Sequence, residues 1–148
     1  MGIPRGISEF KFTTALNYLS GAATRNGAAL DMVGFRGVLM VVHFAAIAVG
    51  AVTSIKAQQD TVVGMGTAAD LAGTAQAIAD DDDDQIFIID LYEPVEQFVR
   101  LVVAKDATNA TAECAAYIQY GASARPTIPT VADLVTYERH MSPAEGTA

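Results

Sequence analysis

The residues most suited to chemistry are five consecutive aspartates at positions 80–84, in the stretch IADDDDDQI. Carboxylate oxygens are ligands that Ca²⁺ prefers, so Asp80, Asp82 and Asp84 are the candidate metal ligands. The run lacks the spaced D-x-D-x-D-G pattern of an EF-hand, and consecutive carboxylates cannot all point at one ion. The sequence favours a solvated hairpin loop that holds neighbours apart by charge, and calcium binding is the alternative.

The other polar residues form no recognised catalytic pattern. His43 lies within an apolar run and His140 lies near the carboxyl terminus, without the spacing of a metal-binding pair. Glu93 and Glu96 supply two carboxylates, but closeness on a turn does not set two groups across a substrate cleft. No serine has a G-x-S-x-G context, and no glycine motif that cradles phosphate is present. We therefore expect no catalytic site, no bound cofactor and no enzyme activity. A small β-barrel enzyme with a deep polar pocket is an alternative.

Length and charge narrow the class of protein. The 148 residues predict one domain, residues 1–148, large enough to fold around its own core. A net charge of −8 repels phosphate backbones, so we expect no binding to nucleic acid. The single Cys114 cannot form an internal disulfide, and its alanine neighbours predict a small buried apolar filler. The amino terminus has no apolar run after its first charges, so we expect no secretory signal.

One long apolar stretch raises the question of a membrane. Residues 37–55 carry no formal charge between Arg36 and Lys56, close to the length that a membrane-spanning helix requires. The stretch contains His43, many alanines and glycines, and Leu39 as its single leucine. From Ile47 onward apolar residues alternate with others, as in a half-buried strand, and residues 35–44 fit a strand covered on both faces. We expect two strands that form a hairpin, with a turn near residues 45–48 or 50, and no membrane span.

Further segments repeat the strand pattern. Alternation over residues 85–92, 98–106 and 113–121 predicts three strands, and residues 70–79 predict a weak one. Residues 10–23 fit either a helix or a strand, and their alternation favours a strand. A last strand or helix is expected after residue 130. Seven or eight short strands with turns between them predict an all-β sandwich or barrel. The arms at residues 1–12 and 132–148 lie outside the densest strand pattern.

Several of these segments together resemble a family of known proteins. The K-x-Q-Q strand end, the D-L-A-G-T turn, the aspartate run, F-V-R-L-V-V and A-Y-I-Q-Y-G occur in this order over residues 34–126, with SPAEGTA in the last element. This order resembles the capsid cement or decoration proteins of tailed bacteriophages. The resemblance implies a single-domain β-sandwich of jelly-roll type that binds the outer capsid as a homodimer or homotrimer.

The resemblance also implies a function and a location. We expect a virion protein, made in the cytoplasm of a host bacterium, that stabilises the shell by bridging subunits of the major capsid protein. The expected interface residues are Phe10, Phe12, Tyr137 and His140, on arms that become ordered on binding. The alternative function is a calcium-assisted receptor-binding or glycan-binding domain on a virion spike, which would use the aspartate run.

Overall fold

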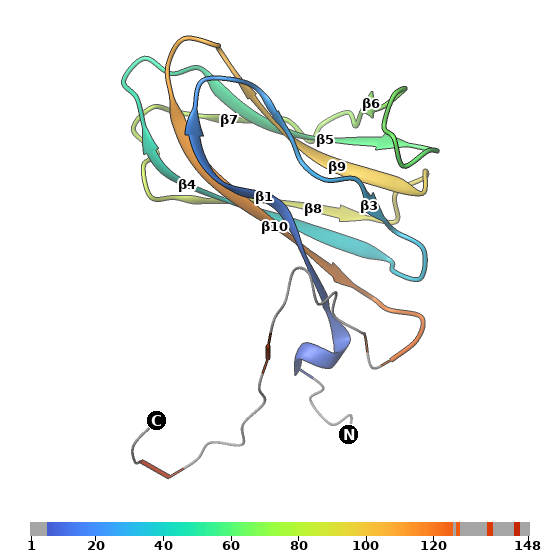
Figure 1. Ribbon diagram of the computed structural model, residues 1–148. Coiled ribbons are helices and arrows are strands. Elements are labelled where there is room, and N and C mark those ends of the chain that lie inside the picture. Colours follow the sequence, from blue (N-terminus) through green and yellow to red (C-terminus); the bar gives the residue numbers. More distant parts are fainter. Residues whose placement is uncertain (1–5, 126, 128–135, 138–143, 146–148) are drawn as a thin grey trace.

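Two antiparallel sheets packed face to face form the protein, shown as a computed structural model that describes residues 6–125, 127, 136–137 and 144–145 (Figure 1). Sheet A contains, in spatial order, β1 (Lys11–Gly21), β10 (Thr111–Tyr120), β4 (Gly37–Ile47) and β8 (Ile86–Tyr92). Sheet B is centred on β9 (Phe98–Lys105) and β5 (Thr53–Asp60). The short strands β2 (Arg25–Asn26) and β3 (Leu30–Asp31) pair with β9, and β6 (Ala69–Asp70) and β7 (Gln76–Ile78) pair with β5. A short 3₁₀ helix, η1 (Gly6–Glu9), precedes β1.

The order in which strands pair is that of a jelly roll. β1 pairs with β10, β2 and β3 with β9, β4 with β8, and β5 with β6 and β7, so the pairs are nested like one long hairpin. Successive pairs alternate between the two sheets, which rolls the hairpin into a sandwich. The short strands β2 and β3 follow each other along β9 and together take the place of one strand, and β6 and β7 do the same along β5. The ten strands of the described chain therefore correspond to the eight strands of a jelly roll. The all-β sandwich predicted from the sequence is confirmed.

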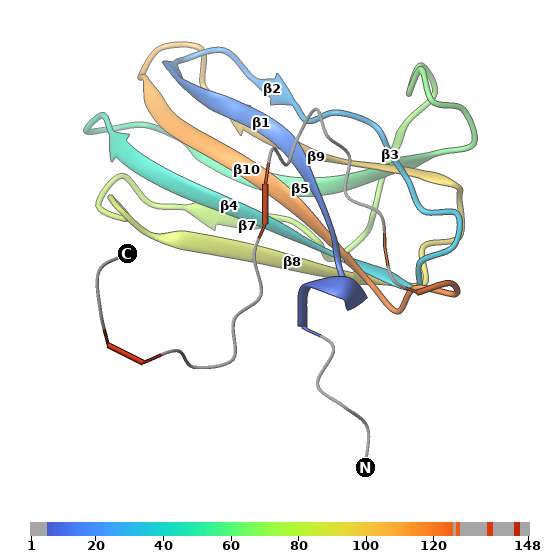
Figure 2. The ribbon, with the colours of Figure 1, turned by 60° about the horizontal axis from the view of Figure 1, so that its bottom comes forward.

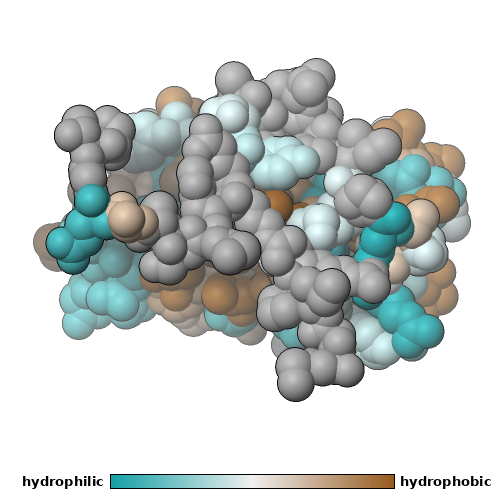
Figure 3. Space-filling view, turned by 90° about the horizontal axis from the view of Figure 1, so that it is seen from below, coloured by the Kyte–Doolittle hydropathy of each residue, from teal (hydrophilic) through white to brown (hydrophobic). Residues whose placement is uncertain are grey.

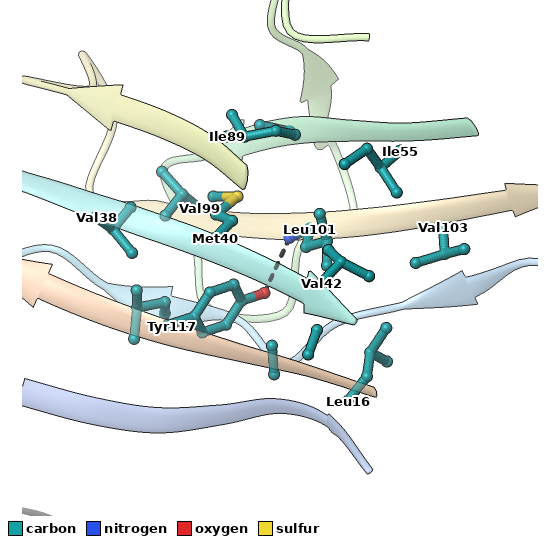
Figure 4. Packing of buried hydrophobic residues seen from close by; sticks show 14 of the residues in the cluster. Leu16, Val38, Met40, Val42, Ile55, Ile89, Val99, Leu101, Val103 and Tyr117 are labelled. Carbon is teal, nitrogen blue, oxygen red and sulfur yellow. Dashed lines mark hydrogen bonds between the residues drawn. The ribbon is translucent and has the colours of Figure 1, made fainter. Parts of the chain in front are cut away.

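The core lies between the inner faces of the two sheets. Val38, Met40 and Val42 of β4 point inward at every second position and meet Val99 and Leu101 of β9 (Figure 4). This alternation is the pattern that a strand with one buried face requires. The strands that alternate in the sequence, β4 and β9, therefore supply the apolar contact between the two sheets.

Tyr117 of β10 joins the two sheets through hydrogen bonds in the core. Its hydroxyl accepts the backbone N–H of Leu101 and donates to the carbonyl of Ala28, each at 2.9 Å (Figure 4). Burial raises the pKa of Tyr117 to about 12. Gly27 makes room for this hydroxyl, since a Cβ there would lie 2.5 Å from the phenolic oxygen. Sheet A and sheet B are thus fixed relative to each other at this point.

The long apolar stretch forms two strands, as predicted, but not a hairpin. β4 ends at Ile47 in sheet A and β5 begins at Thr53 in sheet B, so the chain crosses between sheets through a turn in which Gly50 has a φ of 81°. The expected hairpin is wrong because the two strands pair with other strands in different sheets: β4 pairs with β10 and β8, and β5 pairs with β9, β6 and β7. Among the described residues, no helix has the length and apolar character needed to span a membrane.

Candidate interaction surfaces

The outer face of sheet A carries apolar side chains where a solvent-facing sheet is usually polar. Residues paired across neighbouring strands share a face, so the register identifies its members. Its apolar members are Phe12 and Tyr18 in β1, Cys114, Ala116 and Ile118 in β10, Leu39 and Val41 in β4, and Ile86 and Ile88 in β8. The polar residues Thr14, His43 and Asp90 lie on the same face. Ile86 and Ile88 are 61% and 48% exposed. Figure 3 views this side of the molecule, where brown apolar surface shows beside the grey atoms.

The outer face of sheet B is polar by comparison. Lys56 and Gln58 of β5 both donate to the carboxylate of Asp70, at 2.7 Å, and Arg100 of β9 donates to Gln58 at 2.8 Å. Hydrogen bonds to Lys56 and Gln58 lower the pKa of Asp70. A hydrogen-bonded network of this kind is suited to water. The apolar outer face therefore distinguishes sheet A from sheet B, and apolar patches on a protein surface mark interaction sites when they are large.

A shallow hollow lies on the outer face of sheet A between β1 and β4. The residues that line it include Tyr18, Val41, His43, Cys114 and Ala116. Cys114 is half-buried and points away from the core, so the prediction of a small buried apolar filler is wrong. The strand alternation that buries Tyr117 necessarily turns Cys114 outward. The thiol is thus a natural reporter of whatever covers this face.

Three loops meet at the end of the sandwich where β1 begins, and we call residues 32–36, 93–97 and 121–125 together the loop end (Figure 1). Backbone hydrogen bonds tie these loops together: Glu93 N–H donates to the Arg36 carbonyl at 2.7 Å, and Ser123 N–H donates to the Gly34 carbonyl at 2.8 Å. Shallow hollows run between them. Val33 and Val95 are 68% and 91% exposed, so the loop end is ordered yet presents apolar side chains to solvent.

The opposite end of the sandwich is acidic. Residues 48–52, 79–85 and 106–110, which we call the acidic end, contain six aspartates and no lysine or arginine. Asp80 accepts the N–H of Gly50 and Asp83 accepts the N–H of Ile47, each at 2.6 Å, and Asp82 accepts the N–H of Ala79 at 2.8 Å. The loop joins β7 in sheet B to β8 in sheet A, so it is not the hairpin that the sequence suggested.

Asp106 fixes the last loop of the acidic end. Its carboxylate accepts N–H groups from Asn109 and Thr108, each at 2.8 Å, and from Val52 at 3.1 Å. The hydrogen bonds from Asn109, then Thr108, hold the pKa of Asp106 well below its usual range. Because Val52 belongs to the neighbouring loop, Asp106 links two connections of the acidic end. The negative charge therefore sits on a rigid frame.

The predicted site residues are spread over the molecule. Asp80 and Asp82 of the calcium candidate bind backbone N–H groups as described, and no group of three or more His, Cys, Asp and Glu that could hold a metal occurs in the described chain. Phe10, 37% exposed, precedes β1 near the loop end, and Phe12 lies on the outer face of sheet A. Tyr137 is 52% exposed, and His140 lies outside the described residues.

The interior contains a buried ionic network that the sequence pattern does not predict. Glu113 of β10 points into the interior with no exposed side chain, where its carboxylate lies 2.8 Å from Lys105 Nζ and 2.9 Å from Arg25 Nη1. Lys105, also fully buried, donates further to the carbonyls of Gly21 and Thr111. The network clamps β2 and β9 of sheet B to β10 of sheet A. It satisfies charges that would be costly if unpaired, which indicates a structural role.

No protein-family model matches this chain, and no curated protein is similar to it. The family resemblance noted in the sequence therefore stays a prediction.

Proposed function

We propose that this protein is a virion structural protein that binds the outer surface of a tailed-phage capsid and stabilises it by bridging major capsid protein subunits. The observation that carries the proposal is the difference between the two ends of the sandwich. The loop end presents exposed Val33 and Val95 on an ordered frame, and Phe10 lies nearby. The acidic end concentrates negative charge without a basic residue in its loops.

This difference suits a domain that stands on a shell. The loop end would contact the capsid, together with the N-terminal arm that Phe10 continues. The acidic end would face solvent, where like charges on neighbouring particles repel each other. A clamp that binds only the assembled shell stabilises it by mass action. Copies of the protein, as dimers or trimers, would bridge adjacent capsid subunits on the exterior of the virion.

The direct test is binding to expanded capsids that lack the protein. We expect the purified protein to sediment with these capsids and to raise the temperature at which they release DNA. A folded protein that does not sediment with them would contradict the proposal. A thermal shift with Ca²⁺, together with binding to cell-surface glycan, would support the alternative receptor-binding function instead.

Matched variants at the two ends test the proposed orientation. Val33→Asp with Val95→Asp places charge in the proposed contact and should abolish sedimentation with capsids while leaving the fold intact, because both side chains are exposed. Asp81→Asn with Asp84→Asn removes charge from the acidic end but leaves the hydrogen-bonded carboxylates of Asp80 and Asp83 in place. This second variant should bind normally and yield particles that aggregate more readily. If the acidic-end variant lost capsid binding and the loop-end variant kept it, the acidic end would be the one that contacts the capsid.

A further inference from the structure

The apolar outer face of sheet A requires an occupant that the described residues do not supply. β4 is apolar on both sides: Met40 and Val42 enter the core, while Leu39 and Val41 point outward. A near-continuous apolar strand is typical of sheets covered on both faces. Beside it on β8, Ile86 and Ile88 are more exposed still. Covering such side chains stabilises a protein in proportion to the apolar area removed from water.

The course of the chain after β10 brings the carboxyl-terminal segment to the border of this face. Arg125 forms an ion pair with Glu9 at 3.2 Å. Thr127 N–H donates to the carbonyl of Ser8 at 3.0 Å, and the Thr127 hydroxyl donates to the carbonyl of Phe10. The chain thus returns from the end of β10 to the entry of β1, which is the edge strand of sheet A (Figure 2). Phe12, two residues beyond Phe10, is the first apolar residue of the outer face.

The segment that follows Thr127 is long enough and apolar enough to cover this face. Crossing four strands spaced about 4.8 Å apart takes roughly 15 Å, which about five extended residues can span. Residues 128–148 number 21. Their large apolar members are Ile128, Val131, Leu134, Val135, Tyr137 and Met141, interspersed with polar residues. These apolar side chains are available to contact a sheet.

We propose that residues 128–141 of the same chain dock on the outer face of sheet A, over Leu39, Val41, Cys114 and Ile118. The anchoring of Thr127 beside Phe10 makes this docking intramolecular, so the segment competes at a high effective concentration with any second copy or foreign partner. The proposal concerns a different surface from the loop end and does not depend on capsid binding.

The single thiol of the chain tests the proposal. Cys114 lies on the face in question, so the rate at which it reacts with DTNB reports whether the face is covered. In the full chain, Leu134→Asp with Val135→Asp should raise this rate about tenfold, because the docked segment then spends more time released. Val62→Asp with Val63→Asp, which changes exposed residues of the loop between β5 and β6, is the matched control and should leave the rate unchanged. Equal rates in the full chain and in the Leu134→Asp, Val135→Asp variant would overturn the proposal.

Cross-linking is a second measurement, which leaves every residue of the outer face of sheet A unchanged and identifies what covers that face. Leu134→Cys adds one thiol to the segment, and a short bis-maleimide should then join it to Cys114 within one chain. A cross-linked monomer whose yield is independent of protein concentration supports the proposal. Cross-linked dimers would show that a second copy is the occupant, and an absence of cross-links would show that the segment lies elsewhere. Either of these results overturns it. A chain ending at Thr127, folded by circular dichroism, should react faster with DTNB and regain protection from added peptide 128–148.

Discussion

The buried carboxylate of Glu113 supports the most specific prediction about stability. It accepts from Lys105 and Arg25, and the Thr111 hydroxyl lies 3.3 Å from its second oxygen. Glu113→Gln keeps the shape but leaves two cations without a counter-charge, one of them fully buried. Removing one partner of a buried ion pair costs about 3 to 5 kcal/mol, a large part of the roughly 5 to 15 kcal/mol that stabilises a typical domain. We expect a loss of this size for Glu113→Gln.

Urea unfolding followed by far-UV circular dichroism measures the effect. The matched control is Glu93→Gln, because Glu93 pairs with Arg36 at 3.9 Å with both side chains more than half exposed. A surface pair of this kind contributes at most about 1 kcal/mol and is weakened by salt, whereas the buried network is screened much less. A Glu113→Gln protein within about 0.5 kcal/mol of the parent would refute the reasoning, since surface changes of that size are commonplace.

A double-mutant cycle separates the charge interaction from packing. Lys105→Met removes the buried cation and leaves the carbonyls of Gly21 and Thr111 without this donor. If the two charges interact directly, the combined loss in Lys105→Met with Glu113→Gln should be smaller than the sum of the single losses by about 1 to 3 kcal/mol. Additive losses would show that the ion pair is energetically unimportant.

Three further predictions concern the core and the acidic end. Tyr117 has a raised pKa in the folded protein, so it is ionised more easily in the unfolded chain. The free energy of unfolding should therefore be unaffected by this group below pH 10 and should fall by about 2 to 3 kcal/mol as the pH rises to about 12. Tyr117→Phe should weaken this pH dependence, as measured by urea unfolding at alkaline pH. Gly27→Ala should cost about 1 to 3 kcal/mol in urea, and less when Tyr117→Phe removes the oxygen that its Cβ meets. Asp106 has a lowered pKa, so its contribution is present above pH of about 4 and is lost as the pH falls further; Asp106→Ala should show a weaker fall in thermal midpoint under acid than the parent.

The sequence predicted local structure well wherever one face of a strand is buried. Residues 85–92 and 98–106 alternate clearly, and the structure has β8 and β9 there with Ile89, Val99 and Leu101 buried. The sequence did not predict which strands pair with each other. β4 and β5 are neighbours in sequence but lie in different sheets, because β4 pairs with β10 and β8 whereas β5 pairs with β9, β6 and β7. Alternation is a local signal and contains no information about which strand lies alongside.

The functional surfaces were harder to predict for a related reason. The charge of residues 80–84 is plain in the sequence, but the Asp80 and Asp83 carboxylates bind N–H groups 30 and 36 positions away. Glu113 was missed because its cations, Arg25 and Lys105, come from other strands. The available signal was the parity of β10, which places Glu113 on the same face as Tyr117.

The alternation of β10 also explains why sheet A has polar residues on its inner face and apolar residues on its outer face. Along β10, Glu113, Tyr117 and Gln119 point inward, and Cys114 and Ile118 point outward. Each of these inward residues bonds to sheet B or the adjoining loops: Glu113 pairs with Lys105, Tyr117 bonds to Leu101 and Ala28, and Gln119 Nε2 donates to the Asp31 carbonyl. The register is then fixed by the interior, since a shift by one residue would bury Ile118 and expose the ion pair.

Fixing the interior in this way leaves the outward residues of β10 free to be apolar without endangering the register. Ile118, with Leu39 beside it on β4, can therefore serve a second contact. The loop end and this face are separable. Charge at Val33 and Val95 should prevent capsid binding without altering the reactivity of Cys114. Charge at Leu134 and Val135 should raise that reactivity even if no capsid is ever bound.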